Sequence, residues 1–463
     1  MIINKYPSND IRSNILSGET NRITKFNRRY KMYNDNFSEQ VIHKLGKIYR
    51  AFALLKLDVQ LNTNNNIYKQ VVNDISNVYS FGVNRTFESD AAQELYNDLR
   101  IDKTMAQANR YMNAFNDVLI QVSWDFDKQI PKIMLRLPHQ TEVGYNQGEV
   151  NWVAYFVEMT GTDNKTERWA YWSDTEHYYI DKQNGNEKIV AIEDNEEMVN
   201  PFGVLPFVFL HNGWRDEEFW DAYTGDDLTN GTIDLSVHRT FLNHIIKTQS
   251  FKQLIGKGDN ISELKGKVLD PLSILTLTGQ NTEIDVLDLQ SNYEQLHKTI
   301  QELANEIAVN YGISPNQFRM TGQVSSGFAL QMENLKLDKF TQEQQQDFRV
   351  YEIELFNMIK LVSETYGVNY GNSDLIIDFG EPSYPTSTQE QINIDQQSID
   401  LGLISPHKIL MRENPDLTEE DARVQVDDNI NARNEMLNKV KTGGSLNDTM
   451  TALGINANTW CNI

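Results

Sequence analysis

The sequence is poor in cysteine and in long apolar runs. Cys461 is the one cysteine in 463 residues, so no disulfide can form within the chain, which fits a reducing compartment. The apolar run Val204–Leu210 contains Pro206 and is far too short to span a bilayer. The first ten residues, MIINKYPSND, lack the basic-then-apolar order of a signal peptide. We therefore expect neither export by that route nor insertion into a membrane.

Basic residues are also scarce relative to acidic ones. The chain has 42 Lys and Arg against 65 Asp and Glu, a formal net charge of -23. This balance argues against a protein that grips nucleic acid through a broad basic surface, but not against one that encloses DNA without holding it. With 40% hydrophobic and 23% charged residues, the chain is typical of a folded protein, long enough for two or more domains.

Enzyme motifs are missing. No Gly-x-x-x-x-Gly-Lys-Ser/Thr loop occurs, because Gly256-Lys257-Gly258 and Gly266-Lys267 lack the spacing. His238 and His244 are six residues apart, which puts them on different faces of a helix. Cys461 has no partner residue near it in the sequence. We therefore expect no catalytic residue and no cofactor.

Acidic clusters occur at Asp125/Asp127, Glu193–Glu197, Glu217/Glu218 and Asp226/Asp227. A two-metal nuclease needs carboxylates that converge from separate parts of the chain on both ions. Each cluster here is local and has no partnering motif, so a solvated face or a helix cap explains it and no metal site is expected. Asp226 and Asp227 precede a helical stretch, where they would stabilise the helix dipole.

The first half of the chain changes from helical to alternating patterns. Residues up to about 122 read as mainly helical, with apolar residues at helical spacing in Phe37–Leu57 and Ala91–Val122. From about Leu119 to Leu210 the pattern alternates and is rich in aromatics, which indicates antiparallel strands. Lys182–Lys188, with Asn184-Gly185 at its centre, is the clearest hairpin turn.

The second half is predicted to be mostly helical. The expected elements are a helix Asp226–Ile255, a small β-rich insertion 256–290, a helix Ser291–Tyr311, a long helix Ser326–Tyr366, a strand Asp374–Gly380 and short helices from Thr388–Leu401 onward. The insertion is too short for a core of its own. The single late strand most simply pairs back into the earlier sheet. Ser405 and Thr418 are candidate N-caps of the last two helices. The order predicts an α+β fold.

A polar loop, Gly312–Ser325, lies between two of the predicted long helices. Its candidate functional residues are Asn316, Gln317, Arg319, Thr321, Gln323 and Ser325. These neutral donors and acceptors with one cation suit weak contact with a phosphate backbone without base reading. The plainer alternative is a helix start capped by Ser325 or Ser326, and nothing more.

Lysines concentrate on the helices and the insertion before this loop. They are Lys247, Lys252, Lys257, Lys265, Lys267 and Lys298. These lysines would face a channel or a motor protein. The alternative is that they face solvent and only keep the protein soluble.

Four segments together resemble the portal protein family of tailed bacteriophages, of the siphophage type. They read RYMNAFNDVLIQVSWD (110–125), FWDAYTGDDLTNGTIDLSVHRTFLNHI (219–245), SSGFALQMENLKLDKFTQEQQQDFRVYEIELFNMI (325–359) and GLISPHKILMRENPDLTEEDARVQVDDNINARNE (402–435). Each is weak alone, but the four occur in the family's order, and the resemblance covers roughly residues 20–440.

The resemblance implies a portal-type fold that assembles as a ring, usually of twelve subunits. Its parts would be a wing (1–224), stem helix 1 (225–255), a clip (256–290), stem helix 2 (291–311), a tunnel loop (312–325), a long wing helix with the returning strand (326–384), and a crown with the C-terminal tail (385–463).

The implied role is structural. The ring would occupy one capsid vertex of the virion, after assembly in the host cytoplasm, and pass double-stranded DNA non-specifically during packaging and ejection. Its implied partners are the terminase large subunit, a head–tail adaptor, and major capsid and scaffolding proteins. No association with a membrane is implied. The alternatives are another capsid-vertex or connector protein, and a metal-dependent nucleic-acid enzyme.

Overall fold

The computed structural model describes most of the chain, in two compact units. It describes residues 19–48, 61–146, 148–161, 166–184, 186–193, 195–215, 218–249, 253–257, 283–287, 293–314, 327–369, 374–382, 388–414 and 417–441. One unit comprises Met1–Gly322 and Glu333–Pro382, and the other comprises Gln323–Met332 and Ser383–Ile463.

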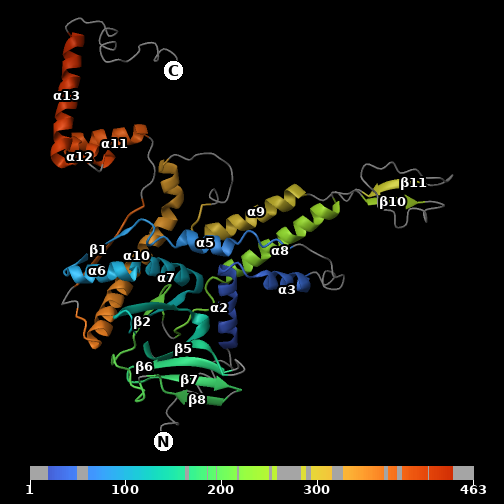
Figure 1. The fold of residues 1–463 in the computed structure, drawn as a ribbon. Coiled ribbons are helices and arrows are strands. Elements are labelled where there is room, and N and C mark those ends of the chain that lie inside the picture. Colours follow the sequence, from blue (N-terminus) through green and yellow to red (C-terminus); the bar gives the residue numbers. More distant parts are fainter. Residues whose placement is uncertain are drawn as a thin grey trace. The chain divides into compact units, whose positions relative to one another are not determined.

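The N-terminal part of the first unit is helical, as predicted (Figure 1). Its helices are α2 (Glu19–Tyr33), α3 (Ser38–Ile48), α5 (Ile67–Ile75), α6 (Asp90–Leu99) and α7 (Ile101–Phe115). The predicted helical stretch Ala91–Val122 was too long, because it is broken at Arg100 and ends at Asn116. Both residues have left-handed backbones, with φ of 52° and 66°. Strand β2 begins directly after Asn116, two residues before the predicted switch at Leu119.

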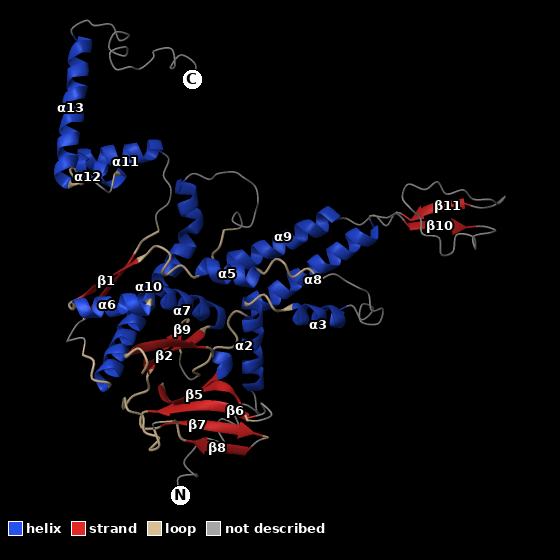
Figure 2. Cartoon of the chain, in the orientation of Figure 1, coloured by secondary structure: helices blue, strands red, loops and turns tan. Residues whose placement is uncertain are grey.

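Two antiparallel sheets follow, as the alternating pattern predicted (Figure 2). A three-stranded sheet has the order β3–β2–β9, from β2 (Asp117–Asp125), β3 (Ile130–Arg136) and β9 (Phe207–His211). A short 3-10 turn, η1 (Pro138–Gln140), leads to a five-stranded sheet of β4 (Thr141–Asn146), β5 (Glu149–Thr160), β6 (Thr166–Ser173), β7 (His177–Gln183) and β8 (Asn186–Val190), each paired with the next. The pairing Gln183↔Asn186 confirms the predicted hairpin turn.

The predicted late strand exists, but its predicted partner was wrong. Strand β12 (Leu375–Phe379) pairs antiparallel with β1 (Val83–Phe87), a strand that the sequence analysis missed, and not with the sheets of residues 117–211. Leu375, Ile377 and Phe379 alternate as buried residues along β12. The ring of Phe379 packs edge-on against Tyr79, at 5.5 Å between centroids. An aromatic contact therefore covers the buried face of the β1–β12 sheet.

The described central segments are helices and a pair of antiparallel strands. They are α8 (Asp226–Gln249), β10 (Gln253–Lys257), β11 (Glu283–Leu287), α9 (Tyr293–Asn310) and α10 (Gly327–Thr365). The two long helices predicted after residue 290 are confirmed. Helix α8 was predicted to extend to Ile255. That was wrong, because Ile255 lies in β10 and pairs with Asp285 of β11. That pairing confirms β structure at both ends of the predicted insertion.

Helix α10 carries much of the core of the first unit. Its buried side chains include Phe348, Leu355, Phe356 and Ile359. Among them lies Glu352, with no exposed surface. Glu352 accepts hydrogen bonds from Arg85 Nε at 2.6 Å and from the Tyr79 hydroxyl at 2.5 Å, so the buried charge is paired. This contact ties the middle of α10 to β1.

The second unit contains α11 (Thr388–Asp400), α12 (Pro406–Glu413) and α13 (Glu419–Lys441). The predicted cap at Thr418 is confirmed, since its hydroxyl accepts the Asp421 N–H at 3.3 Å. Ser405 occupies the predicted N-cap position before Pro406, but its side chain makes no capping hydrogen bond. Among the described helices of both units, none is long and apolar enough to cross a membrane.

Candidate functional site

The predicted loop residues Asn316, Gln317, Arg319, Thr321, Gln323 and Ser325 lie outside the described residues, as do Lys252, Lys265 and Lys267. Lys247 falls in α8 and Lys257 in β10, at positions whose side chains are also outside the described part. Lys298 is described: its side chain is 76% exposed and its ammonium lies 3.7 Å from Glu302, one turn on. In this region the structure describes the helices on either side of the loop, α8 and α9 before it and α10 after it. We call these helices and their contacts the frame of the loop.

The frame begins with α8 and α9, which pack side by side (Figure 1). They are in close contact at Gly231. A Cβ built on this glycine would lie 2.6 Å from Ile307 Cδ1, so a larger residue there would require the Ile307 side chain to shift. The α8 side chains Leu228, Ile233, Leu235 and Val237 are all buried. Helix α8 is therefore held on several sides.

Helix α9 ends in a Schellman motif. The Gly312 N–H donates to the Val309 carbonyl at 3.1 Å, and the Ile313 N–H donates to the Ala308 carbonyl at 2.9 Å. Gly312 has a left-handed backbone with φ of +76°, which suits glycine best. Ile313 and Ala308 are both buried, which gives the motif its usual apolar contact. The motif turns the chain sharply just before the loop.

Helix α10 contacts the turn at the end of α9 through two side chains. The Lys336 ammonium donates to the Val309 carbonyl at 3.1 Å and so compensates the carboxyl end of α9. The Ser314 hydroxyl donates to Glu333 Oε2 at 3.3 Å. Ser314, the last described residue before the loop, is thus hydrogen-bonded to the second turn of α10, the helix that follows the loop.

The start of α8 is fixed by ion pairs. Asp226 accepts from the Lys25 ammonium at 2.6 Å and from Arg29 at 3.3 Å, both on α2. Asp227 accepts from the Tyr311 hydroxyl at 2.8 Å. Burial raises the pKa of Tyr311, and the Asp227 charge raises it further. The prediction that this acidic pair begins a helix is confirmed, and the pair also links α8 to the end of α9.

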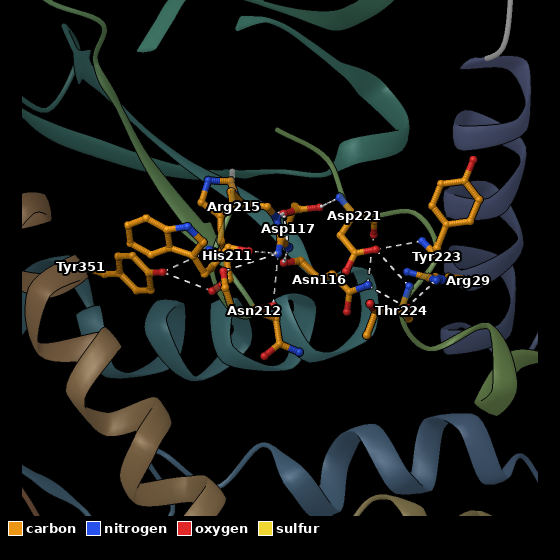
Figure 3. Close-up of polar contacts among 12 residues, drawn as sticks. Arg29, Asn116, Asp117, His211, Asn212, Arg215, Asp221, Tyr223, Thr224 and Tyr351 are labelled. Atoms are coloured by element: carbon orange, nitrogen blue, oxygen red, sulfur yellow. Dashed lines mark hydrogen bonds and ion pairs between the residues drawn. The ribbon is translucent and has the colours of Figure 1, made fainter. Parts of the chain in front are cut away.

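Behind this start lies a polar cluster that we call the α8 junction: Asn116, Asp117, His211, Arg215 and Asp221 (Figure 3). Asp117 is fully buried. Its Oδ1 accepts from His211 Nδ1 and from Arg215, each at 2.8 Å, and its Oδ2 accepts the Asp221 N–H at 2.8 Å. One carboxylate thus joins the first residue of β2 to the end of β9 and to the segment before α8.

The Asn116 amide completes the junction. Its Nδ2 donates to the carbonyls of Asp221 at 3.0 Å and Thr224 at 2.7 Å. The buried Arg29 guanidinium also donates to Thr224, at 2.7 Å. Burial opposes ionisation of Asp221, but hydrogen bonds from Thr224 and Tyr223 outweigh it and lower its pKa. The segment that leads into α8 is therefore held by polar contacts from α2, α7 and β2.

This junction was not predicted from the sequence. One signal was available: Asp117 is a single charge before the apolar run Val118, Leu119, Ile120. A charge inside a buried strand must be paired, so a basic partner was to be expected. No sequence pattern identified Arg215, nearly one hundred residues later, as that partner.

No metal site was found among the residues that the structure describes. No group of three or more His, Cys, Asp or Glu side chains there is placed to hold an ion. Asp125 instead accepts the N–H groups of Asp127 and Lys128, each at 3.1 Å, and so closes its own turn.

Comparison with known proteins decides the family. The model of the family described as phage portal protein, SPP1 Gp6-like, matches residues 12–439. The chain belongs to the SPP1 Gp6-like phage portal protein family. This is a structural, non-enzymatic family, and membership confirms the resemblance seen in the sequence.

Similar solved structures include a chain from the neck of a native gene transfer agent particle computed with C12 symmetry (10% identity, 78% of this chain and 89% of that chain covered, TM-score 0.40). A chain from the neck of the empty particle, computed with C6 symmetry, has 11% identity over 74% and 87%, with a TM-score of 0.39. A chain from the native virion has 10% identity over 74% and 88%, with a TM-score of 0.36. No curated protein sequence matched the chain. The assignment rests on the family match over residues 12–439.

Proposed function

We propose that this portal protein assembles as a homo-oligomeric ring of about twelve subunits at one capsid vertex of the virion, and that the ring is the channel for DNA in packaging and ejection. Family membership is the observation that carries the proposal. The acidic chain suits it, since a net charge of -23 discourages tight trapping of DNA.

In this proposal, α8 and α9 form the stem, and Gly312–Ser325 is the tunnel loop at the narrowest part of the channel. The frame described above supports the loop's role. A loop that contacts moving DNA needs a fixed base, and the Schellman turn at Gly312 with the Ser314–Glu333 contact supplies one. The loop's neutral polar residues would make contacts weak enough to break as DNA moves.

The remaining parts receive the roles implied by the family resemblance. The β10–β11 segment is the clip, which docks the terminase large subunit and later a head–tail adaptor. Residues 1–224, with α10 and β12, form the wing, which meets the major capsid and scaffolding proteins. Residues 385–463 form the crown. A two-stranded pairing in the clip region is consistent with a small sheet that neighbouring subunits complete.

A loop replacement tests the channel role. Residues 315–325 are replaced by a short Gly/Ser linker, with Gly312–Ser314 kept so that the turn and its contact with Glu333 remain. We expect rings to form as in the wild type, and DNA packaged per particle to fall severalfold. The matched variant Arg319→Ala keeps the loop length and should have a smaller effect. Normal packaging with the loop replaced, or loss of folding in a thermal melt, would contradict the channel role.

A further inference from the structure

A pocket of about 150 Å³ lies between α8, α9 and the start of α5. Its floor is apolar, from Ile67, Leu242, Ile300 and Ala304. Its rim is polar and carries Asn65, Arg239, His297, Gln301 and Asn305. Amides, one histidine and one arginine therefore surround an apolar base, and no carboxylate lines the pocket.

Arg239 is the only residue of the rim with a permanent charge, and it is half-buried. With its carbonyl oxygen turned toward the guanidinium, the Asn65 amide accepts from both terminal nitrogens, at 2.5 and 2.9 Å. Among the described residues no ion pair to a carboxylate is found for Arg239. Burial lowers the pKa of its guanidinium, and no nearby anion acts against this. A half-buried cation held by one neutral amide is poorly compensated, so an anion would bind favourably here.

The other side of α9 is acidic. Gln301 and Asn305 point into the pocket, whereas Glu302 and Glu306 lie roughly 100–140° around the axis from Gln301, at about 100° per residue. Both glutamates are exposed. Glu302 lies 3.7 Å from Lys298 on the same helix, and no ion pair of Glu306 is found within the described part of the chain. Helix α9 thus lines the Arg239 pocket on one side and carries carboxylates on another.

A ring joins one patch of each subunit to a different patch of the next, so complementary charges must lie on different sides of the subunit. We infer that the Arg239 pocket takes a glutamate from a second copy of this chain, and that Glu306 of α9 is that glutamate. The inference rests on the proposed ring. It identifies one contact by which adjacent helix pairs would recognise each other.

Charge reversal on the full-length chain tests the pair. We expect Arg239→Glu and Glu306→Arg each to weaken ring formation about tenfold in the apparent association constant, as loss of a close charge pair does. The double variant should recover most of it. Mass photometry over a concentration series measures the ring fraction. The control Lys128→Glu makes the same charge change at a side chain that is 72% exposed on the β2–β3 turn, and should assemble normally.

The outcomes separate this inference from the proposed function. If the wild type forms no ring, both are overturned. If the wild type forms rings and Arg239→Glu behaves like Lys128→Glu, only the inference is overturned. Intact rings that retain less DNA would instead mean that the pocket binds phosphate of the DNA backbone. If Arg239→Glu lowers the melting temperature strongly, Arg239→Gln replaces it, and normal assembly of that neutral variant would overturn the inference.

Discussion

At the scale of single residues, the α8 junction depends on one buried carboxylate. Asp117 accepts hydrogen bonds from His211, Arg215 and the Asp221 N–H. These groups come from segments about one hundred residues apart, so Asp117 fixes the path of the chain into α8. Its role is structural, and it determines how α8 is placed.

Asp117→Asn should lower the free energy of unfolding by about 3–5 kcal/mol, because it leaves the Arg215 charge without its buried partner. Urea unfolding measures this. Asp127→Asn, in the exposed β2–β3 turn, is the matched control and should change stability by less than about 0.5 kcal/mol. Equal effects of the two substitutions would show that Asp117 does not hold the junction.

Two histidines predict how stability depends on pH. Burial lowers the pKa of His139 to about 4 and that of His177 to about 4. An unfolded histidine titrates near about 6.5, so the unfolded state binds more protons between these values. The free energy of unfolding should therefore fall as pH drops from about 6.5 to about 4.

His139→Phe tests this dependence, because phenylalanine has no titratable group. The His139 ring lies against Tyr30, at 4.5 Å between centroids, and near Phe115, so an aromatic ring suits this position. The variant should lose less stability than the wild type between pH 7 and pH 5 in urea unfolding. An identical loss in both proteins would assign the pH dependence to other groups.

At the scale of elements, periodicity predicted the long helices and turn chemistry predicted the β7–β8 hairpin. Other features had no local signal. The break at Arg100 occurs without Gly or Pro, and β1 is only five residues long. The partner of β12 depends on a tertiary aromatic cluster that no local pattern contains. The loop was found as a polar stretch between helices, but the contacts of its frame join residues about 20 to 30 positions apart.

Gly312→Ala should destabilise the turn before the loop by about 1 kcal/mol, because alanine disfavours a positive φ. The new Cβ would also lie 3.3 Å from the Lys336 side chain. The matched control is Gly46→Ala in α3, where no atom lies within 4 Å of the new Cβ. That variant should be neutral or gain up to about 1 kcal/mol. Thermal melts of both variants test the contrast, and equal shifts would contradict the strained-turn explanation.

At the scale of the whole molecule, the family match and the structure give different information. The family match covers residues 12–439, so it includes the helix pair, the hairpin segments and the loop. The structure adds how the loop frame and the α8 junction are held within one subunit. In the proposed function DNA passes through the assembled ring, so the proposal depends on how subunits meet around α8 and α9.

Imaging of the purified full-length chain by electron microscopy tests the central claim most directly. One subunit has a mass of 53.5 kDa, so the proposed ring should appear as a particle of several hundred kilodaltons with a central hole and rotational symmetry. The same sample should not cleave DNA in the presence of Mg²⁺. A stable monomer that cleaves DNA with Mg²⁺ would contradict the account.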